Sequence, residues 1–241
     1  MPYKIKSVTD TPPERVAHSF QKIPVRQSPT LLGPGRNDPF HGGIRADDQA
    51  LVFAMMAADR RHIYLVLTKR PGIMRSRLAS REFPGMVRDA LGTLATMAGQ
   101  RRRMTPARRR ILADVAAARQ APWPLPNVLL GVSAGNDHRA RVRLPVLRKT
   151  PAAARFVSAE PLIGPVTEDL AGIAWLICGG ESGPRHRPMN PDWARSLRDQ
   201  CQAQGVAFWF KQVGGRTPKV GGDLLDGRAW KQHYDGMEVS R

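Results

Sequence analysis

The stretch 174–182, AWLICGGES, shows the pattern that decides the fold: a short apolar run ends in glycines and polar residues. Four further apolar runs end in the same way. They are His62–Leu67 before Thr68-Lys69-Arg70, Val128–Val132 before Ser133 and Asn136, Arg155–Val157 before Ser158 and Glu160, and Val206–Phe210 before Lys211-Gln212. Short β-branched and aromatic runs that alternate with helical segments predict βα units and a mostly parallel sheet. The sequence therefore predicts an α/β protein.

The polar clusters that end these runs predict a functional site. In sheets of parallel strands, ligands bind beyond the carboxyl ends of the strands, where loops and helix N-termini gather. We expect four charged side chains to carry chemistry there: Lys69, Glu160, Glu181 and Lys211. The expected ligand-binding residues are Thr68, Arg70, Ser133, Asn136, Ser158, Gly179, Gly180, Ser182, Arg187 and Gln212.

The residue types at these positions suggest particular roles. An acid such as Glu160, directly after a buried run, is costly inside a core but useful at the mouth of a binding site. Lys69 and Lys211 would bind an anionic substrate, supply a desolvated amine nucleophile, or pair with the two acids and close the mouth. The glycines of 179–183 allow positive φ and close approach of backbone N–H groups to a phosphate or carboxylate. The same glycines also suit an ordinary tight connection.

Composition limits the class of protein. The 241 residues, 41% of them hydrophobic, suit a chain with a full core. No apolar stretch approaches the ~20 residues that span a bilayer. The first residues, Met1-Pro2-Tyr3-Lys4, carry no apolar signal region, which predicts a cytoplasmic protein. Cys178 and Cys201, the only cysteines, fit reduced thiols in a core. The six histidines show no ligand spacing, so no metal site is predicted.

Basic residues are in large excess, with 38 Lys and Arg against 20 Asp and Glu, a net charge of +18. Such a charge attracts polyanions, although the same excess could be purely compositional. The charge is dense in a predicted helical insertion at about 74–122. Its two arginine triplets, 101–103 and 108–110, could contact a phosphate backbone or form a solvated helix face. The candidate nucleic-acid-binding residues are Arg101, Arg102, Arg103, Arg108, Arg109 and Arg110.

Helix and turn signals complete the predicted organisation. Prolines make residues 1–40 irregular apart from a short strand at Thr30–Leu32. A helix is predicted for Asp47–Arg60, with Leu51, Met55 and Ala58 on its apolar face, and another from Pro71. A third is predicted to begin after the capping residue Asn190 and to end at Gly205. The main α/β body then spans 41–213, and 214–241 is a tail that packs on it.

Six motifs in order resemble one protein family. They are LTKRP at 67–71, PLPNVLLGVSAGN at 124–136, PAAARFVSAEPLIGPV at 151–166, CGGESGPRHRPMNPDWARSLRDQC at 178–201, FKQ at 210–212 and LLDGRAW at 224–230. The chain resembles radical-SAM-like proteins of unknown function encoded by bacteriophages and prophages. The resemblance implies a partial (β/α) TIM-like barrel of the radical-SAM type in a bacterial host. In full-length relatives it implies a [4Fe–4S] cluster with S-adenosylmethionine.

The chain departs from the pattern that this resemblance implies. Full-length relatives carry three closely spaced cysteines near the N-terminus, whereas no cysteine precedes Cys178 here. Gly135 replaces an acid, and Val213 and Gly215 replace an aromatic residue and an acid. Gly179-Gly180-Glu181 is similar to an adenosylmethionine-binding motif that normally follows an earlier strand, so that role is not carried over. No cofactor is expected from this chain alone.

Three functions are compatible with these features. The first is a cluster-less relative whose barrel binds or modifies a nucleotide or nucleic acid at its C-terminal face. The second is a non-catalytic nucleic-acid-binding phage protein that uses the arginine-rich insertion. The third is a cluster-independent lyase in which Lys69 or Lys211 acts with Glu160. We rank them in that order.

Overall fold

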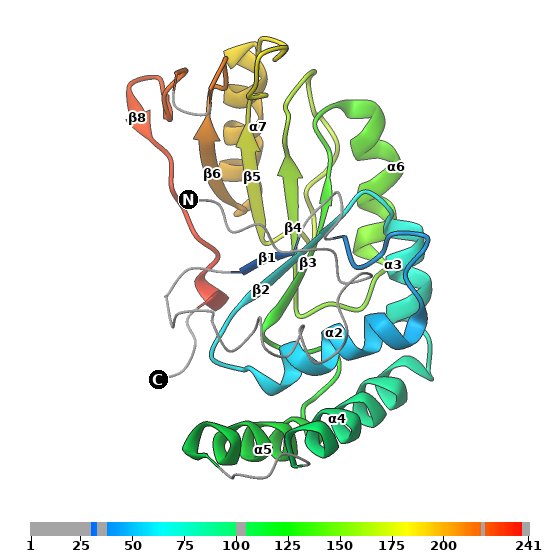
Figure 1. Cartoon of the computed structure of the whole chain (residues 1–241). Helices are drawn as coiled ribbons and strands as arrows, with labels where there is room; N and C mark the ends of the chain where they lie inside the picture. The colour runs from blue at the N-terminus through cyan, green and yellow to red at the C-terminus, as the bar shows by residue number, and fades with distance from the viewer. Residues whose placement is uncertain (1–29, 33–37, 100–104, 218–219, 238–241) are drawn as a thin grey trace. The chain divides into compact units, whose positions relative to one another are not determined.

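The structure is a computed structural model that describes residues 30–32, 38–99, 105–217 and 220–237 (Figure 1). Most of the predicted irregular segment, and the triplet 101–103, lie outside the described residues. The side chain of Arg108 does so too, although its backbone belongs to a helix. None of the described helices is long and apolar enough to cross a membrane.

Helices and strands alternate along the chain, as the sequence predicts, in a mixed α/β fold. The strands of the main sheet are β1 (Thr30–Leu32), β2 (Tyr64–Thr68), β3 (Val128–Ser133), β4 (Ala154–Ala159), β5 (Trp175–Gly179) and β6 (Ala207–Gln212). The helices are α2 (Ala46–Ala58), α3 (Pro71–Leu78), α4 (Phe83–Gly99), α5 (Pro106–Ala118), α6 (Asp137–Arg148) and α7 (Pro191–Gln204). Every predicted strand and helix is thus present, with ends shifted by one or two residues.

The sheet has the order β1-β2-β3-β4-β5-β6, so strands follow one another as they do in the chain. β1 pairs with β2 in parallel, and β4, β5 and β6 pair in parallel in that order. Among the described residues no pairing joins β1 to β6, so no closed barrel is observed. A parallel sheet is therefore confirmed, whereas a TIM-like barrel is not.

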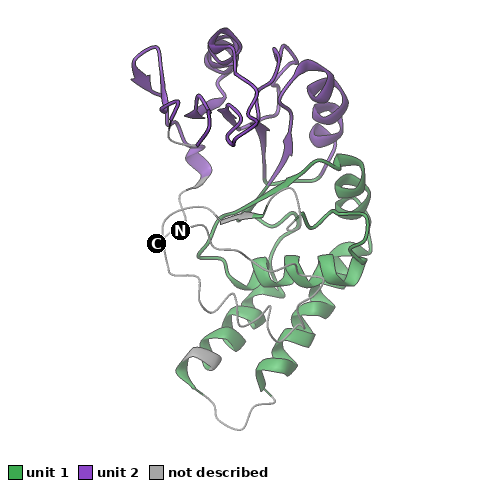
Figure 2. Ribbon diagram, turned by 45° about the horizontal axis from the view of Figure 1, so that its top comes forward, with its two compact units in different colours: residues 1–129, 151–153, 241 green, residues 130–150, 154–240 purple. Residues whose placement is uncertain are grey.

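The chain divides into two compact units (Figure 2). The first comprises residues 1–129, 151–153 and 241, and the second residues 130–150 and 154–240. The predicted domain limits at residues 40 and 213 stay predictions.

In the first unit, α2 packs against α4 and α5. Phe53 of α2 lies in an aromatic cluster with Phe40, Phe83 and Trp123, at ring-centroid distances of 5.6–6.2 Å. The predicted apolar face of this helix is wrong in part, because Leu51 is only half-buried. The fully buried residues include Phe53, Ala54 and Met56, since two helices as well as the preceding segment cover α2.

In the second unit, α7 packs against β5 and β6, and Figure 1 shows it behind these strands. Asn190 Oδ1 accepts a hydrogen bond from the backbone N–H of Asp192 at 2.9 Å, which caps α7. Gly205 ends the helix in the left-handed conformation, with φ 67°. Both predicted helix ends are confirmed. Leu197 and Cys201 of α7 are fully buried, as are Phe208 and Phe210 of β6.

The segment after β6 forms a hairpin and then runs along β6. The hairpin strands β7 (Leu224–Leu225) and β8 (Arg228–Ala229) are joined by Asp226 and Gly227, both at positive φ, as a type I′ turn requires. The chain then pairs with β6 in the antiparallel sense at Trp209 and Lys231. Two backbone hydrogen bonds fix it there, from Phe210 N to Trp230 O and from Gln232 N to Phe208 O. The outer edge of β6 is therefore already hydrogen-bonded.

Candidate functional site

Glu160 and Lys211 form an ion pair at the carboxyl ends of β4 and β6: Glu160 directly follows β4, and Lys211 is the penultimate residue of β6. Glu160 Oε1 lies 3.0 Å from Lys211 Nζ, and the Ser158 hydroxyl donates a hydrogen bond of 3.3 Å to Glu160 Oε2. The Glu160 side chain is 21% exposed and that of Lys211 is 52% exposed. The pair is thus held at one end by the protein and is open to solvent at the other.

Gly179 leaves room beside this pair. A Cβ atom at position 179 would lie 3.0 Å from Glu160 Oε1 and 3.4 Å from Lys211 Cβ. A side chain at this position would therefore require the Glu160 carboxylate to shift by a few tenths of an ångström. The structure thus brings Ser158, Glu160, Gly179 and Lys211 together, all of them predicted site residues.

Two backbone N–H groups of the loop Gly179–Gly183, for which an anion nest and a tight connection are both expected, are hydrogen-bonded within the protein. The Gly180 N–H donates to the Gln212 carbonyl at 2.9 Å, and the Gly183 N–H donates to the Gly215 carbonyl at 2.9 Å. The Gln212 side chain donates to the Ser182 hydroxyl at 2.9 Å. These contacts tie the loop to the segment that follows β6. Two of the N–H groups expected to bind an anion therefore already have partners within the protein.

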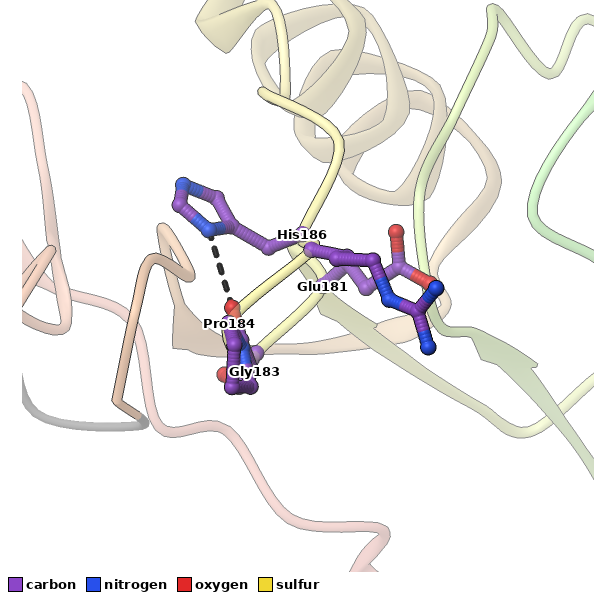
Figure 3. Close-up of a pocket in the computed structure, with 6 residues that line it drawn as sticks. Glu181, Gly183, Pro184 and His186 are labelled. Carbon is purple, nitrogen blue, oxygen red and sulfur yellow. Dashed lines mark hydrogen bonds between the residues drawn. The ribbon is translucent and has the colours of Figure 1, made fainter.

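Glu181 pairs with Arg187 and with neither of the predicted lysines. The Arg187 guanidinium donates to both carboxylate oxygens, at 2.7 and 2.9 Å, and the Arg187 N–H adds a bond of 2.9 Å. These hydrogen bonds from Arg187 lower the pKa of Glu181 to about 2. The same loop, residues 181–186, lines a shallow depression of about 370 Å³. In Figure 3, Glu181 and His186 point to different sides of this loop.

In the first unit, Thr68 and Arg70 are arranged around Asp38, a residue that the sequence patterns did not reveal. Asp38 is fully buried, and its Oδ2 accepts hydrogen bonds from the Thr68 hydroxyl at 2.9 Å and from Arg70 Nη1 at 3.1 Å. Its Oδ1 accepts from the backbone N–H of Phe40 at 2.9 Å. Asp38 therefore holds Arg70 at the carboxyl end of β2, next to the exposed Lys69. No periodic pattern surrounds Asp38, so only the fold identifies it.

Two further predicted ligand residues have structural roles. Asn136 Oδ1 accepts a hydrogen bond from the backbone N–H of Arg139 at 3.0 Å and thereby caps α6. Ser133 is buried, and its carbonyl accepts a bond of 2.5 Å from the Arg143 guanidinium. Burial lowers the pKa of Arg143.

In the described part of the arginine-rich insertion, the helices α4 and α5 pack on each other. Arg109 and Arg110 are exposed on α5. Neither has an acidic partner within 4 Å among the residues that the structure describes.

The residues of this chain do not fit an iron–sulfur cluster. Cys178 and Cys201 are both buried free thiols on neighbouring elements of the second unit, and a cluster requires three or four cysteine ligands. Burial raises the pKa of both thiols, that of Cys201 to about 12. In the described ranges no group of three His, Cys, Asp or Glu side chains could hold a metal ion.

The fold and this site define an α/β protein of parallel strands with charged side chains at the carboxyl ends of its sheet. The model of one protein family, described as a protein of unknown function (DUF5131), matches residues 8–234. The chain therefore belongs to this family. No curated protein and no solved structure matches it.

Proposed function

We propose that the second unit binds a phosphate-bearing ligand, a nucleotide or a nucleic acid, beyond the carboxyl ends of β4, β5 and β6. The observation that carries this proposal is the ion pair of Glu160 and Lys211 beside Gly179, in which the ammonium group is half-exposed. Parallel sheets bind ligands at this edge. The net charge of +18 favours an anionic ligand.

The two charged groups suit two parts of a nucleotide. An ammonium group is a compact point charge that attracts a phosphate. A carboxylate accepts hydrogen bonds from ribose hydroxyls, as acidic residues do in dinucleotide-binding sheets. Ser158 holds Glu160 in position for such a contact. The proposed role of the pair is binding, and no cofactor takes part in it.

The proposal also covers the type of protein and its origin, which follow from the family that the motifs resemble. We propose a cluster-less, radical-SAM-like protein of phage or prophage origin, in the cytoplasm of its bacterial host. The sequential strand order supports a partial (β/α) barrel, because barrels add each strand next to the preceding one whereas doubly wound sheets reverse direction. The two buried cysteines are the reason for a cluster-less assignment.

Isothermal titration with nucleoside monophosphates tests the binding site. We expect Lys211→Met to weaken binding about ten- to a hundredfold, because a hydrogen bond to a charged group contributes about 1.5–3 kcal/mol. Glu160→Gln should weaken the binding of ligands that carry ribose hydroxyls more than it weakens the binding of inorganic phosphate. Lys149→Met is the matched control, since Lys149 is an exposed lysine of the same unit at the C-cap of α6. Equal affinities for the two lysine variants would contradict the proposed site.

A second candidate function is nucleic-acid binding by the α4–α5 insertion. It is favoured by Arg109 and Arg110, which are exposed and without acidic partners in the described part of the chain. Replacing both by Gln should reduce the slope of log affinity against log salt by about one for each lost phosphate contact. The control variant Arg45→Gln/Arg60→Gln removes two exposed arginines of the same unit that lie outside the insertion. An unchanged slope for both variants would exclude the insertion as the binding surface.

The third candidate, a lysine-dependent lyase, has less support. An amine nucleophile needs desolvation or a cationic neighbour that disfavours its charged form. Lys211 is instead half-exposed and paired with a carboxylate. Borohydride trapping with a panel of carbonyl compounds tests this function, and a covalent adduct on Lys211 or Lys69 would support it.

A further inference from the structure

One face of β4, β5 and β6 continues from the Glu160–Lys211 pair to a group of aromatic side chains. In the parallel register Ser158 lies beside Ile177, and Ile177 lies beside Trp209. Because alternate residues of a strand share a face, Gly179 lies on the same face of β5 as Ile177. The register of β5 and β6 shifts between Cys178 and Gly179, so that Lys211 is an extra residue of β6 at this point. A Cβ atom at Gly179 would lie 3.0 Å from Glu160 Oε1 and 3.4 Å from Lys211 Cβ, so the ion pair lies on this face of β5. Trp209 and the ion pair thus belong to one continuous surface.

The two faces of these strands differ in their covering. The opposite face carries Leu176, Cys178, Phe208 and Phe210, all fully buried on the side of α7. On the face with the ion pair, Trp175 is buried, but Ile177 and Trp209 are only half-buried. This face is therefore apolar and yet reached by solvent next to the charged groups.

The indole of Trp209 is held in a set orientation. It packs edge-on against Trp175, with ring centroids 6.2 Å apart at 85°, and against His233 at 4.6 Å and 69°. Lys231 Nζ lies 5.2 Å from the centroid of the Trp209 ring. This ammonium group is itself fixed by the Phe210 carbonyl at 2.6 Å and by Asp223 at 3.0 Å. A ring held in this way loses little entropy when a ligand packs on it.

We propose that Trp209, with His233 beside it, forms the base-stacking subsite for a nucleoside phosphate whose ribose and phosphate are bound by Glu160 and Lys211. This inference rests on the proposed function and names its ligand class. On β5, Ile177 beside Trp209 and Gly179 beside the ion pair are two residues apart, which is about 7 Å along a strand. This spacing matches the separation between a nucleobase and the sugar-phosphate attached to it. Aromatic side chains stack on any base, so the subsite recognises a base without selecting its sequence.

The test compares a ligand that has a base with one that lacks it, AMP and ribose 5-phosphate, by isothermal titration. Stacking contributes about 1–3 kcal/mol, which corresponds to about a 5- to 150-fold difference in affinity. The wild-type protein should therefore bind AMP more tightly than ribose 5-phosphate by that factor. Trp209→Leu should bind AMP only as tightly as ribose 5-phosphate, and Trp209→Phe should keep most of the preference.

Trp193→Leu is the matched control, because Trp193 is a half-buried tryptophan of the same unit on α7. It should leave the preference for AMP unchanged, and thermal melting checks that each variant is folded. Equal binding of the two ligands by the wild-type protein would overturn the stacking subsite while leaving the phosphate site intact. So would a preference that survives in Trp209→Leu. Failure of both ligands to bind would overturn the phosphate site as well.

Discussion

At the scale of single residues, the glycines around the site are required by close backbone contacts. A Cβ atom at Gly180 would overlap the carbonyl of Val213, and one at Gly135 would overlap the carbonyl of Pro161. Both φ angles lie outside the left-handed region, so the restriction is steric and not conformational. Of the three glycines in 179–183, only Gly183 adopts positive φ. At Gly135 the backbone carbonyl of Pro161 leaves no space for a side chain.

Gly180→Ala tests this steric restriction. The backbone carbonyl of Val213 cannot move as freely as a side chain, so we expect a loss of about 1–3 kcal/mol in the free energy of unfolding. Gly72→Ala is the control, because a Cβ atom on this α3 glycine meets nothing within 4 Å. The control should be neutral or gain up to about 1 kcal/mol. Urea unfolding measures both, and equal effects would contradict the steric explanation.

The pH dependence of Glu181 is a second prediction at this scale. Its pKa of about 2 in the folded protein, caused by hydrogen bonds from Arg187, is below the usual value of about 4.3 for the unfolded chain. The contribution of this pair to stability is therefore present above about pH 4.3 and is lost as the pH falls towards 2. Carboxyl NMR should show a normal titration for Glu181 in Arg187→Gln. In Arg185→Gln the pKa should remain near 2, and a normal value there would contradict the assigned cause.

Sequence patterns predicted which residues form the site better than they predicted which charged side chains pair with each other. The pairing of Glu160 with Lys211 is one of the alternatives that the sequence left open, and the structure shows it. The pairing of Glu181 with a lysine is wrong, because Arg187, six residues away, supplies a bidentate contact. Asp38 could not be predicted, because its role depends on contact with Thr68 and Arg70, which lie some 30 residues further along the chain.

At the scale of elements, local signals predicted the ends of helices and missed the burial of α2. The caps of α7 depend on Asn190 and Gly205, residues that act within their own turn. The buried face of α2 depends instead on α4 and α5, which follow it in the chain and cover it. Local chemistry is readable from sequence, whereas contacts between distant elements are not.

The hairpin and the segment that follows it depend on one aromatic anchor, Trp230. It is 8% exposed, and the guanidinium groups of Arg198 and Arg228 lie 5.3 and 4.3 Å from its ring centroid. We expect Trp230→Ala to destabilise the protein by about 3–5 kcal/mol. Leu224→Ala, at a 51% exposed position of the same hairpin, should change stability by no more than about 0.5 kcal/mol. Thermal unfolding distinguishes the two, and a tolerated Trp230→Ala would show that the hairpin packs weakly.

At the scale of the whole molecule, the repeated apolar runs were sufficient to predict the parallel α/β fold. Each run is short, rich in β-branched or aromatic residues, and followed by a helix signal, so the type of each element is a local property. Closure of the sheet is not a local property, because it depends on whether the first and last strands meet. The sequence therefore could not decide between an open sheet and a barrel.

The reactivity of the two cysteines with a thiol reagent tests whether the core stays closed in the native protein. Both are buried, and burial raises the pKa of Cys201 to about 12, so almost no thiolate is present at pH 8. We expect neither thiol to react with a disulfide reagent in the native protein. Both should react in denaturant. Rapid reaction of either thiol under native conditions would show that the core opens more readily than its packing indicates.

Many proteins with β-structure assemble into polymers when a strand from one copy hydrogen-bonds to the unpaired edge strand of another copy. In this chain the outer edge of β6 is already hydrogen-bonded to residues 230–232. A second copy that offered a strand here would first have to displace this segment together with Trp230. Polymerisation by strand addition at β6 is therefore opposed by the chain's own C-terminal segment.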